Sequence, residues 1–188
     1  MRDVLLARVP DGTLSVLETL PEVDFARLEA LPGVFVQRIE VLVVKPVPSF
    51  FAALAARAGD EADLRFASAL SGTYRNAKWP TYIEPQTDYS GCTAFGKGKL
   101  LEAYRLWSAM ERDFPDRYVT AVSRERGQVQ RNITRSTCAC GDAAAVVREF
   151  EQIAATLDPA DPIVAAVEER LSAVKEERSN IRFGCVSG

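Results

Sequence analysis

Apolar residues recur every three or four positions through the C-terminal part of the chain, and this spacing is typical of amphipathic helices. One such run covers residues 142–157 and a second covers residues 162–178. Two prolines lie in the short link between them, and Asp161 followed by Pro162 suits the start of a helix. The pattern therefore predicts an antiparallel helical hairpin over about 142–178, either as an appendage or as part of the main fold.

Four further helices are predicted upstream of this hairpin. Thr19 and Glu22 match a capping box, and Pro32-Gly33 would end the helix that follows. Polar capping residues and apolar periodicity indicate the others. The predicted ranges are 21–31, 49–57, 60–71 and 99–112.

Strands are predicted where β-branched residues gather between turn residues. The ranges 34–44 and 181–186 each read as one strand. Two β-hairpins are also predicted, the first around Pro10-Asp11-Gly12 and the second around the segment 124–127. Their strands cover residues 3–9 and 13–17, and residues 118–123 and 129–137.

These elements favour an α+β fold, because strands and helices do not alternate regularly along the chain. We expect one domain over residues 1–188 with a small, mostly antiparallel sheet. Residues 72–97 contain several glycines, prolines and tyrosines and predict a long irregular central loop. Loops of this length inside a compact domain often carry function.

The composition is that of an ordinary globular protein. Hydrophobic residues make up 47% of the chain, charged residues make up 26%, and the net charge is −3. No apolar run is long enough for a membrane span, and the first residues do not resemble a secretory signal. These features predict a cytoplasmic protein without a membrane partner, in which thiols stay reduced.

The chain contains no histidine, which excludes Ser-His-Asp triads, Cys-His dyads and histidine metal sites. Its four cysteines are therefore the most informative candidates for chemistry. Three of them adjoin a glycine, which lets the backbone bend around an ion. Four thiolates suit tetrahedral zinc or an iron–sulfur cluster. This hypothesis assigns the metal to Cys92, Cys138, Cys140 and Cys185.

Two alternatives for the cysteines remain open at this point. Free cysteines are often buried and inert. The Cys138-Ala139-Cys140 pair could instead be redox-active, because Cys140 precedes a predicted helix and a helix N-terminus favours the thiolate form.

The segment 91–98 resembles a phosphate-binding loop but lacks its essential parts. Gly98 stands where that loop needs a hydroxyl residue, and no buried strand precedes the segment. No nucleotide is predicted. A weaker hypothesis assigns a bound anion to the backbone N–H groups and ammonium groups at the following helix. It names Gly96, Lys97, Gly98 and Lys99.

Positive charge gathers in the middle of the chain. Residues 72–137 contain 11 basic and 7 acidic residues together with several aromatic side chains. Basic residues near aromatic ones are typical of single-stranded nucleic-acid sites. The residues predicted to contact nucleic acid or an acidic protein are Arg75, Lys78, Trp79, Arg124, Arg126, Arg131 and Arg135.

Together these features lead to one main functional hypothesis and two alternatives, and no motif carries a resemblance to a known family. The main hypothesis is a non-enzymatic subunit of a protein complex, held together by zinc or an iron–sulfur cluster on the four cysteines. The first alternative is an enzyme that uses Cys138 or Cys140 as a thiol and Lys97 and Lys99 as anion binders. The second is a structural assembly component with inert thiols.

Overall fold

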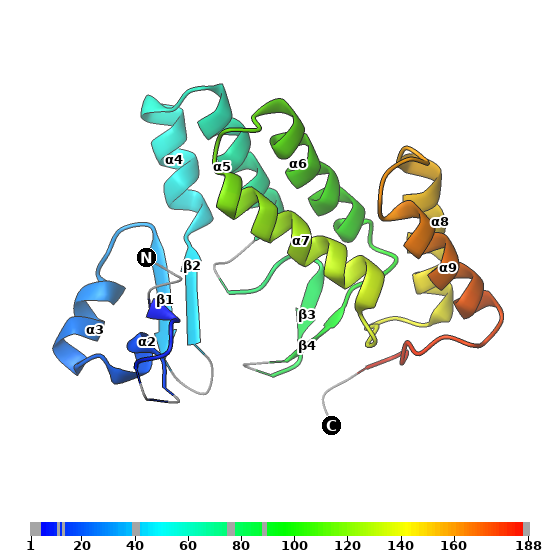
Figure 1. Cartoon of the computed structure of the whole chain (residues 1–188), viewed down its shortest axis with the longest axis horizontal. Coiled ribbons are helices and arrows are strands. Elements are labelled where there is room, and N and C mark those ends of the chain that lie inside the picture. The colour runs from blue at the N-terminus through cyan, green and yellow to red at the C-terminus, as the bar shows by residue number, and fades with distance from the viewer. Residues whose placement is uncertain are drawn as a thin grey trace. The chain divides into compact units, whose positions relative to one another are not determined.

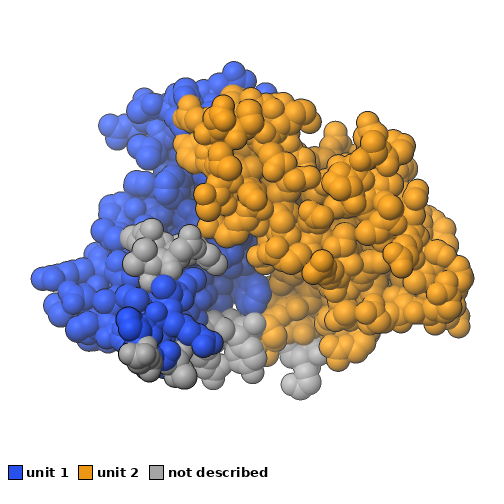
Figure 2. All heavy atoms as spheres, in the orientation of Figure 1, with its two compact units in different colours: residues 1–80 blue, residues 81–188 orange. Residues whose placement is uncertain are grey.

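In the computed structural model, the chain divides into two units, residues 1–80 and residues 81–188, which are described separately (Figures 1 and 2). The prediction of one domain over residues 1–188 stays a prediction. The structure describes residues 5–10, 12, 14–38, 42–74, 78–87 and 90–185.

The first unit begins with short elements around a β-hairpin (Figure 1). Helix α2 (Val16–Thr19) starts with a capping box made by Ser15 and Glu18, whereas the sequence pointed to Thr19 and Glu22. The next elements are α3 (Glu22–Glu29), β1 (Val34–Arg38) and β2 (Leu42–Pro46).

Two strand predictions in this unit are corrected. The range 34–44 holds two antiparallel strands, because Val34 pairs with Pro46 and Arg38 with Leu42. Residues 39–41, which join them, lie outside the described residues. Of the hairpin predicted from residues 3–9 and 13–17, residues 3, 4 and 13 lie outside the described residues. The described part holds one bridge, between Arg8 and Ser15, and α2 takes up the residues that follow.

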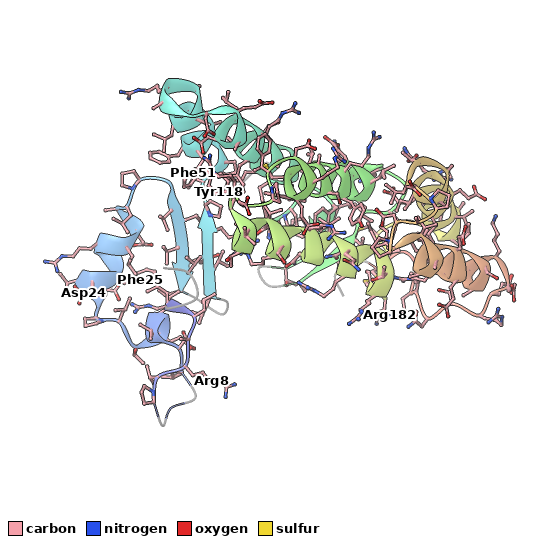
Figure 3. All side chains as sticks on the ribbon, turned by 45° about the horizontal axis from the view of Figure 1, so that its top comes forward. Arg8, Asp24, Phe25, Phe51, Tyr118 and Arg182 are labelled. Carbon is pink, nitrogen blue, oxygen red and sulfur yellow. A yellow bond between two sulfur atoms is a disulfide. The ribbon has the colours of Figure 1, made fainter. Side chains whose placement is uncertain are left out.

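A small apolar core holds these elements together. Phe25 points from α3 toward the strands (Figure 3), where it is buried with Val36, Val44 and Leu17. The guanidinium of Arg38 lies 4.3 Å from the centre of the Phe25 ring and covers it. The unit continues into the paired helices α4 (Pro48–Ala58) and α5 (Glu61–Thr73), which confirm the helices predicted over 49–57 and 60–71.

The described residues of the second unit combine a small antiparallel pair with four long helices, whose arrangement Figure 1 shows. Strands β3 (Ile83–Pro85) and β4 (Gly91–Thr93) pair within the segment that the sequence predicted to be an irregular loop. Helix α6 (Lys99–Asp113) packs against α7 (Val119–Arg135), and α8 (Ala143–Thr156) packs against α9 (Val164–Lys175). The α+β class and the C-terminal helical hairpin are confirmed.

Helix α7 replaces the second predicted β-hairpin. Its β-branched residues suggested strands, and Gly127 suggested a turn. However, Val122, Val129 and Ile133 follow at spacings of seven and four, which places them on one helical face, and all three are buried. Burial of this apolar stripe outweighs the weak local preference for strand.

The final strand predicted over 181–186 is also absent from the described residues. Arg182, labelled in Figure 3, forms an isolated parallel bridge with Cys138, and Gly184 then turns the backbone with a φ of +61°. Val186 lies outside the described residues. None of the described helices is long and apolar enough to cross a membrane.

Candidate functional site

The four cysteines meet where three chain segments of the second unit lie side by side. Residues 137–141, called the ladder segment here, run between β4 and residues 182–185. On one side, the Thr93 N–H donates to the Cys138 carbonyl at 2.9 Å, and the Cys140 N–H donates to the Thr93 carbonyl at 3.0 Å. On the other side, the Ala139 N–H donates to the Arg182 carbonyl at 2.9 Å. Backbone hydrogen bonds thus hold three segments that are far apart in sequence next to one another.

Each edge of this ladder carries a disulfide. Cys92 bonds to Cys140, with their Cα atoms 5.1 Å apart, and Cys138 bonds to Cys185, with their Cα atoms 6.0 Å apart. No free cysteine remains among the described residues, which include all four. The zinc or iron–sulfur hypothesis is therefore wrong, because a sulfur in a disulfide is no longer a thiolate ligand.

The disulfides also overturn the predicted location. That prediction rested on first residues that do not resemble a secretory signal, on the lack of an apolar run long enough for a membrane span, and on the default assumption that thiols stay reduced. Disulfides form and persist mainly in oxidising compartments and are rare in the cytoplasm. Two of them in one unit indicate an oxidising, extracytoplasmic environment.

A pocket of about 400 Å³ opens beside one of the two disulfides. We call it the Cys140 pocket, because this half-buried cysteine contributes to its wall while Cys92 is only 2% exposed. The other polar residues around it come from β3, from the turn after β4 and from the start of α8. They are Glu84, Lys97, Asp142 and Arg148.

Glu84 brings a carboxylate close to the disulfide. A carboxylate oxygen of Glu84 and the sulfurs of Cys92 and Cys140 all lie within 4.8 Å of one another. The Lys97 ammonium forms an ion pair with this carboxylate. The site thus places a carboxylate and a cation next to a disulfide whose Cys140 lines a pocket.

Helix α8 begins directly behind the ladder segment. Asp142 is its N-cap, and its carboxylate accepts the Ala145 N–H at 2.8 Å. Cys140 lies two residues before this cap. The partial positive charge of a helix N-terminus favours a thiolate nearby.

The residues predicted to bind an anion surround a carboxylate of the chain itself. Residues 96–98, called the glycine turn here, donate the N–H groups of Gly96 and Gly98 to one oxygen of Glu149, at 2.8 and 2.9 Å. Both glycines have a positive φ, which L side chains rarely adopt. Glu149 is fully buried, and its other oxygen has no hydrogen-bond partner among the described residues.

The lysines of that prediction are paired as well. Lys97 contacts Glu84, and the Lys99 ammonium lies 2.6 Å from the Glu102 carboxylate. Gly96 and Lys97 line the Cys140 pocket, Gly98 joins Gly96 in binding Glu149, and Lys99 has a partner on its own helix. Binding of an external anion stays a prediction.

The predicted nucleic-acid or partner contacts are spread over both units. Lys78 and Trp79 belong to the first unit, and Arg75 lies outside the described residues. The other four lie on α7. Arg126 forms an ion pair with Glu111 at 2.8 Å and Arg124 one with Glu125 at 3.2 Å. In the part of the chain that the structure describes, Arg131 and Arg135 have no ion-pair partner, and this contact also stays a prediction.

Sequence reasoning missed Glu84, Glu149 and Arg148. Glu149 had a usable signal, because it lies on the apolar face of α8 between Val146 and Ile153. A carboxylate at a buried helical position requires hydrogen-bond donors nearby. Glu84 and Arg148 look like ordinary surface residues in the sequence, and only the fold brings them to a disulfide.

The chain was also compared with known proteins. It matches no family model, no curated protein and no solved structure.

Proposed function

We propose that the protein is a thiol–disulfide exchange enzyme whose reacting bond is Cys92–Cys140. The observation that carries this proposal is the Glu84 carboxylate within 4.8 Å of both sulfurs, at a pocket that Cys140 lines. Cysteine chemistry of this kind needs a sulfur that a substrate can reach and a group that moves a proton. The site provides both.

The accessible sulfur sets the direction of attack. An incoming thiolate attacks Sγ of Cys140, because Cys92 is buried. The Cys92–Cys140 bond breaks, Cys140 forms a mixed disulfide with the substrate, and Cys92 leaves with the electron pair. Glu84 accepts the proton of the incoming thiol and delivers it to the Cys92 thiolate.

A second substrate thiol completes the exchange. Its thiolate attacks the substrate sulfur of the mixed disulfide, and Cys140 leaves as a thiolate that the start of α8 stabilises. The balance is one protein disulfide and two thiols on one side, and one protein dithiol and one substrate disulfide on the other. The reverse reaction reduces a substrate disulfide and restores the protein disulfide.

The test compares two double variants that each keep one disulfide. Cys138→Ser with Cys185→Ser leaves Cys92–Cys140, and Cys92→Ser with Cys140→Ser leaves Cys138–Cys185. The folded proteins are incubated with a peptide that contains two thiols, and peptide oxidation is followed by mass spectrometry. We expect the first variant to oxidise up to one equivalent of peptide per protein, as its own disulfide is reduced, and the second to oxidise none above background.

Glu84→Gln in the first variant provides the second readout. Loss of general acid–base catalysis should slow exchange by about a hundredfold, with the unfolding midpoint unchanged. Failure of Cys92–Cys140 to exchange in the folded protein would contradict the proposal, as would an unchanged rate in Glu84→Gln.

The ladder favours a second function, a structural component with inert cysteines. Both disulfides link segments that already share backbone hydrogen bonds, as expected of bonds that only hold a fold together. The same comparison distinguishes the two functions. A structural role predicts that neither double variant oxidises the peptide while both lose stability.

A further inference from the structure

We infer that the Cys140 pocket selects small thiols that carry a free carboxylate, an inference that rests on the exchange function proposed above. The pocket volume of about 400 Å³ falls in the range of sites for small molecules. The selection comes from the charges around the reacting sulfur.

Two acidic groups line the pocket, and each has a partner in the chain. Glu84 is paired with the Lys97 ammonium, and the Asp142 carboxylate accepts the Ala145 N–H. Glu149, behind the glycine turn, is fully buried and accepts two N–H groups. A cation therefore offsets the charge of Glu84, the partial positive charge of the α8 N-terminus lies beside Asp142, and burial separates Glu149 from a ligand.

One cation of the pocket has no such partner. Arg148 is exposed on α8 and lines the pocket together with Cys140. Among the described residues it has neither an ion pair nor a hydrogen bond. A guanidinium pairs with a carboxylate through two parallel hydrogen bonds, which fixes the orientation of a ligand as well as its charge. A thiol that carries a carboxylate can thus be held by Arg148 while its sulfur reaches Cys140.

The experiment uses the full chain and three thiols of similar size and different charge. They are 3-mercaptopropionate, 2-mercaptoethanol and cysteamine, compared at equal thiolate concentrations. Both disulfides are followed in the same sample by alkylation and mass spectrometry. In the wild-type protein, we expect 3-mercaptopropionate to reduce Cys92–Cys140 about fivefold faster than 2-mercaptoethanol does, with cysteamine slowest. A partly exposed ion pair contributes about 1 kcal/mol, which corresponds to this factor.

Arg148→Glu should reverse the order of the thiols at Cys92–Cys140 and leave their order at Cys138–Cys185 unchanged. Arg105→Gln, which removes an exposed arginine that does not line the pocket, is the matched control and should change neither order. The preference should also weaken between 0.01 M and 1 M salt.

The inference is overturned if Arg148→Glu leaves the order at Cys92–Cys140 as in the wild-type protein. This result is distinct from failure of the proposed function, in which none of the three thiols reduces Cys92–Cys140 in the folded chain.

Discussion

The two disulfides of the second unit share a ladder segment and differ in what surrounds them. Cys92–Cys140 has one buried sulfur, a carboxylate within 4.8 Å and a pocket of about 400 Å³. Cys138–Cys185 lies at the opposite edge, where both cysteines are half-buried and the Gln86 amide donates to the Cys185 carbonyl. Neither of these two cysteines lines the Cys140 pocket.

Because of this difference, the stabilisation that each disulfide gives the fold and its chemical reactivity should depend on different features. The two bonds close loops of nearly equal length, with sequence separations of 48 and 47 residues. They should therefore stabilise the fold to a similar degree. Reactivity depends instead on the groups at each sulfur, and the bond with the carboxylate and the pocket is the one expected to exchange.

The largest expected effect tests whether the two disulfides stabilise the fold to the same degree. Removing either disulfide, by Cys138→Ala with Cys185→Ala or by Cys92→Ala with Cys140→Ala, should lower the free energy of unfolding by about 4 kcal/mol. Urea denaturation followed by Trp107 fluorescence, in a Trp79→Phe background, measures the second unit. If the free energy of unfolding falls in only one of the two double variants, loop closure is not the main source of stabilisation by these disulfides.

The next effect concerns the support behind the Cys140 pocket. Glu149→Ala leaves two buried N–H groups of the glycine turn without an acceptor and creates a cavity, which should cost about 3 kcal/mol. Glu149→Gln is the matched control, because it retains one acceptor oxygen and most of the volume, and it should cost less. Equal losses in the two variants would contradict the role of the carboxylate. Urea denaturation of both variants provides the measurement.

Arg170 supports the start of the ladder segment, two residues before Cys138. Its guanidinium donates to the Ile133 carbonyl at 2.8 Å and to the Ser136 carbonyl, just before the ladder segment begins. Burial lowers the pKa of this guanidinium. Arg170→Met should cost about 2 kcal/mol, and it should speed reduction of Cys138–Cys185 more than that of Cys92–Cys140. Alkylation followed by mass spectrometry gives both rates, and an equal increase at the two bonds would argue against separate supports.

The smallest effect separates two glycines of the same turn. A Cβ at Gly96 would lie 2.9–3.0 Å from atoms of Ala145, mostly backbone, whereas one at Gly98 would lie 3.7 Å from the end of the Gln152 side chain. Both have a positive φ, which costs about 1 kcal/mol for alanine. Gly96→Ala should therefore be about 1 kcal/mol more destabilising than Gly98→Ala in urea denaturation. Equal losses of stability in the two variants would mean that α8 shifts easily at Ala145 to make room for the added Cβ.

Local sequence patterns predicted the helices whose apolar faces repeat regularly. In α8, Val146, Phe150 and Ile153 keep the helical spacing, and Asp142, where the predicted helix begins, is its N-cap. The same logic failed for α7, because β-branched residues and Gly127 suggested a hairpin although the buried positions follow helical spacing. A local sequence pattern predicts an element correctly where secondary-structure propensity and apolar periodicity indicate the same element.

The candidate site depends on contacts that no local pattern contains. The cysteine pairing requires Thr93, Ala139 and Arg182 to be neighbours, and they are distant in sequence. Four cysteines permit three pairings, and sequence alone does not choose among them. The glycine turn was predicted to favour an anion, but its occupant, Glu149, comes from a helix some fifty residues later.

The crossed order of the disulfides has a consequence for how the protein is made. Cys140 pairs backwards to Cys92 and Cys138 pairs forwards to Cys185, so the two closed loops overlap at residues 138–140. During synthesis Cys138 and Cys140 emerge together, and the short loop between them costs far less entropy to close than either native one. Cys185, the native partner of Cys138, is the last of the four cysteines to be synthesised. Until then, Cys138 can form only non-native disulfides. Oxidative folding of this chain should accordingly depend on reshuffling by a disulfide isomerase, and on translation having passed residue 185.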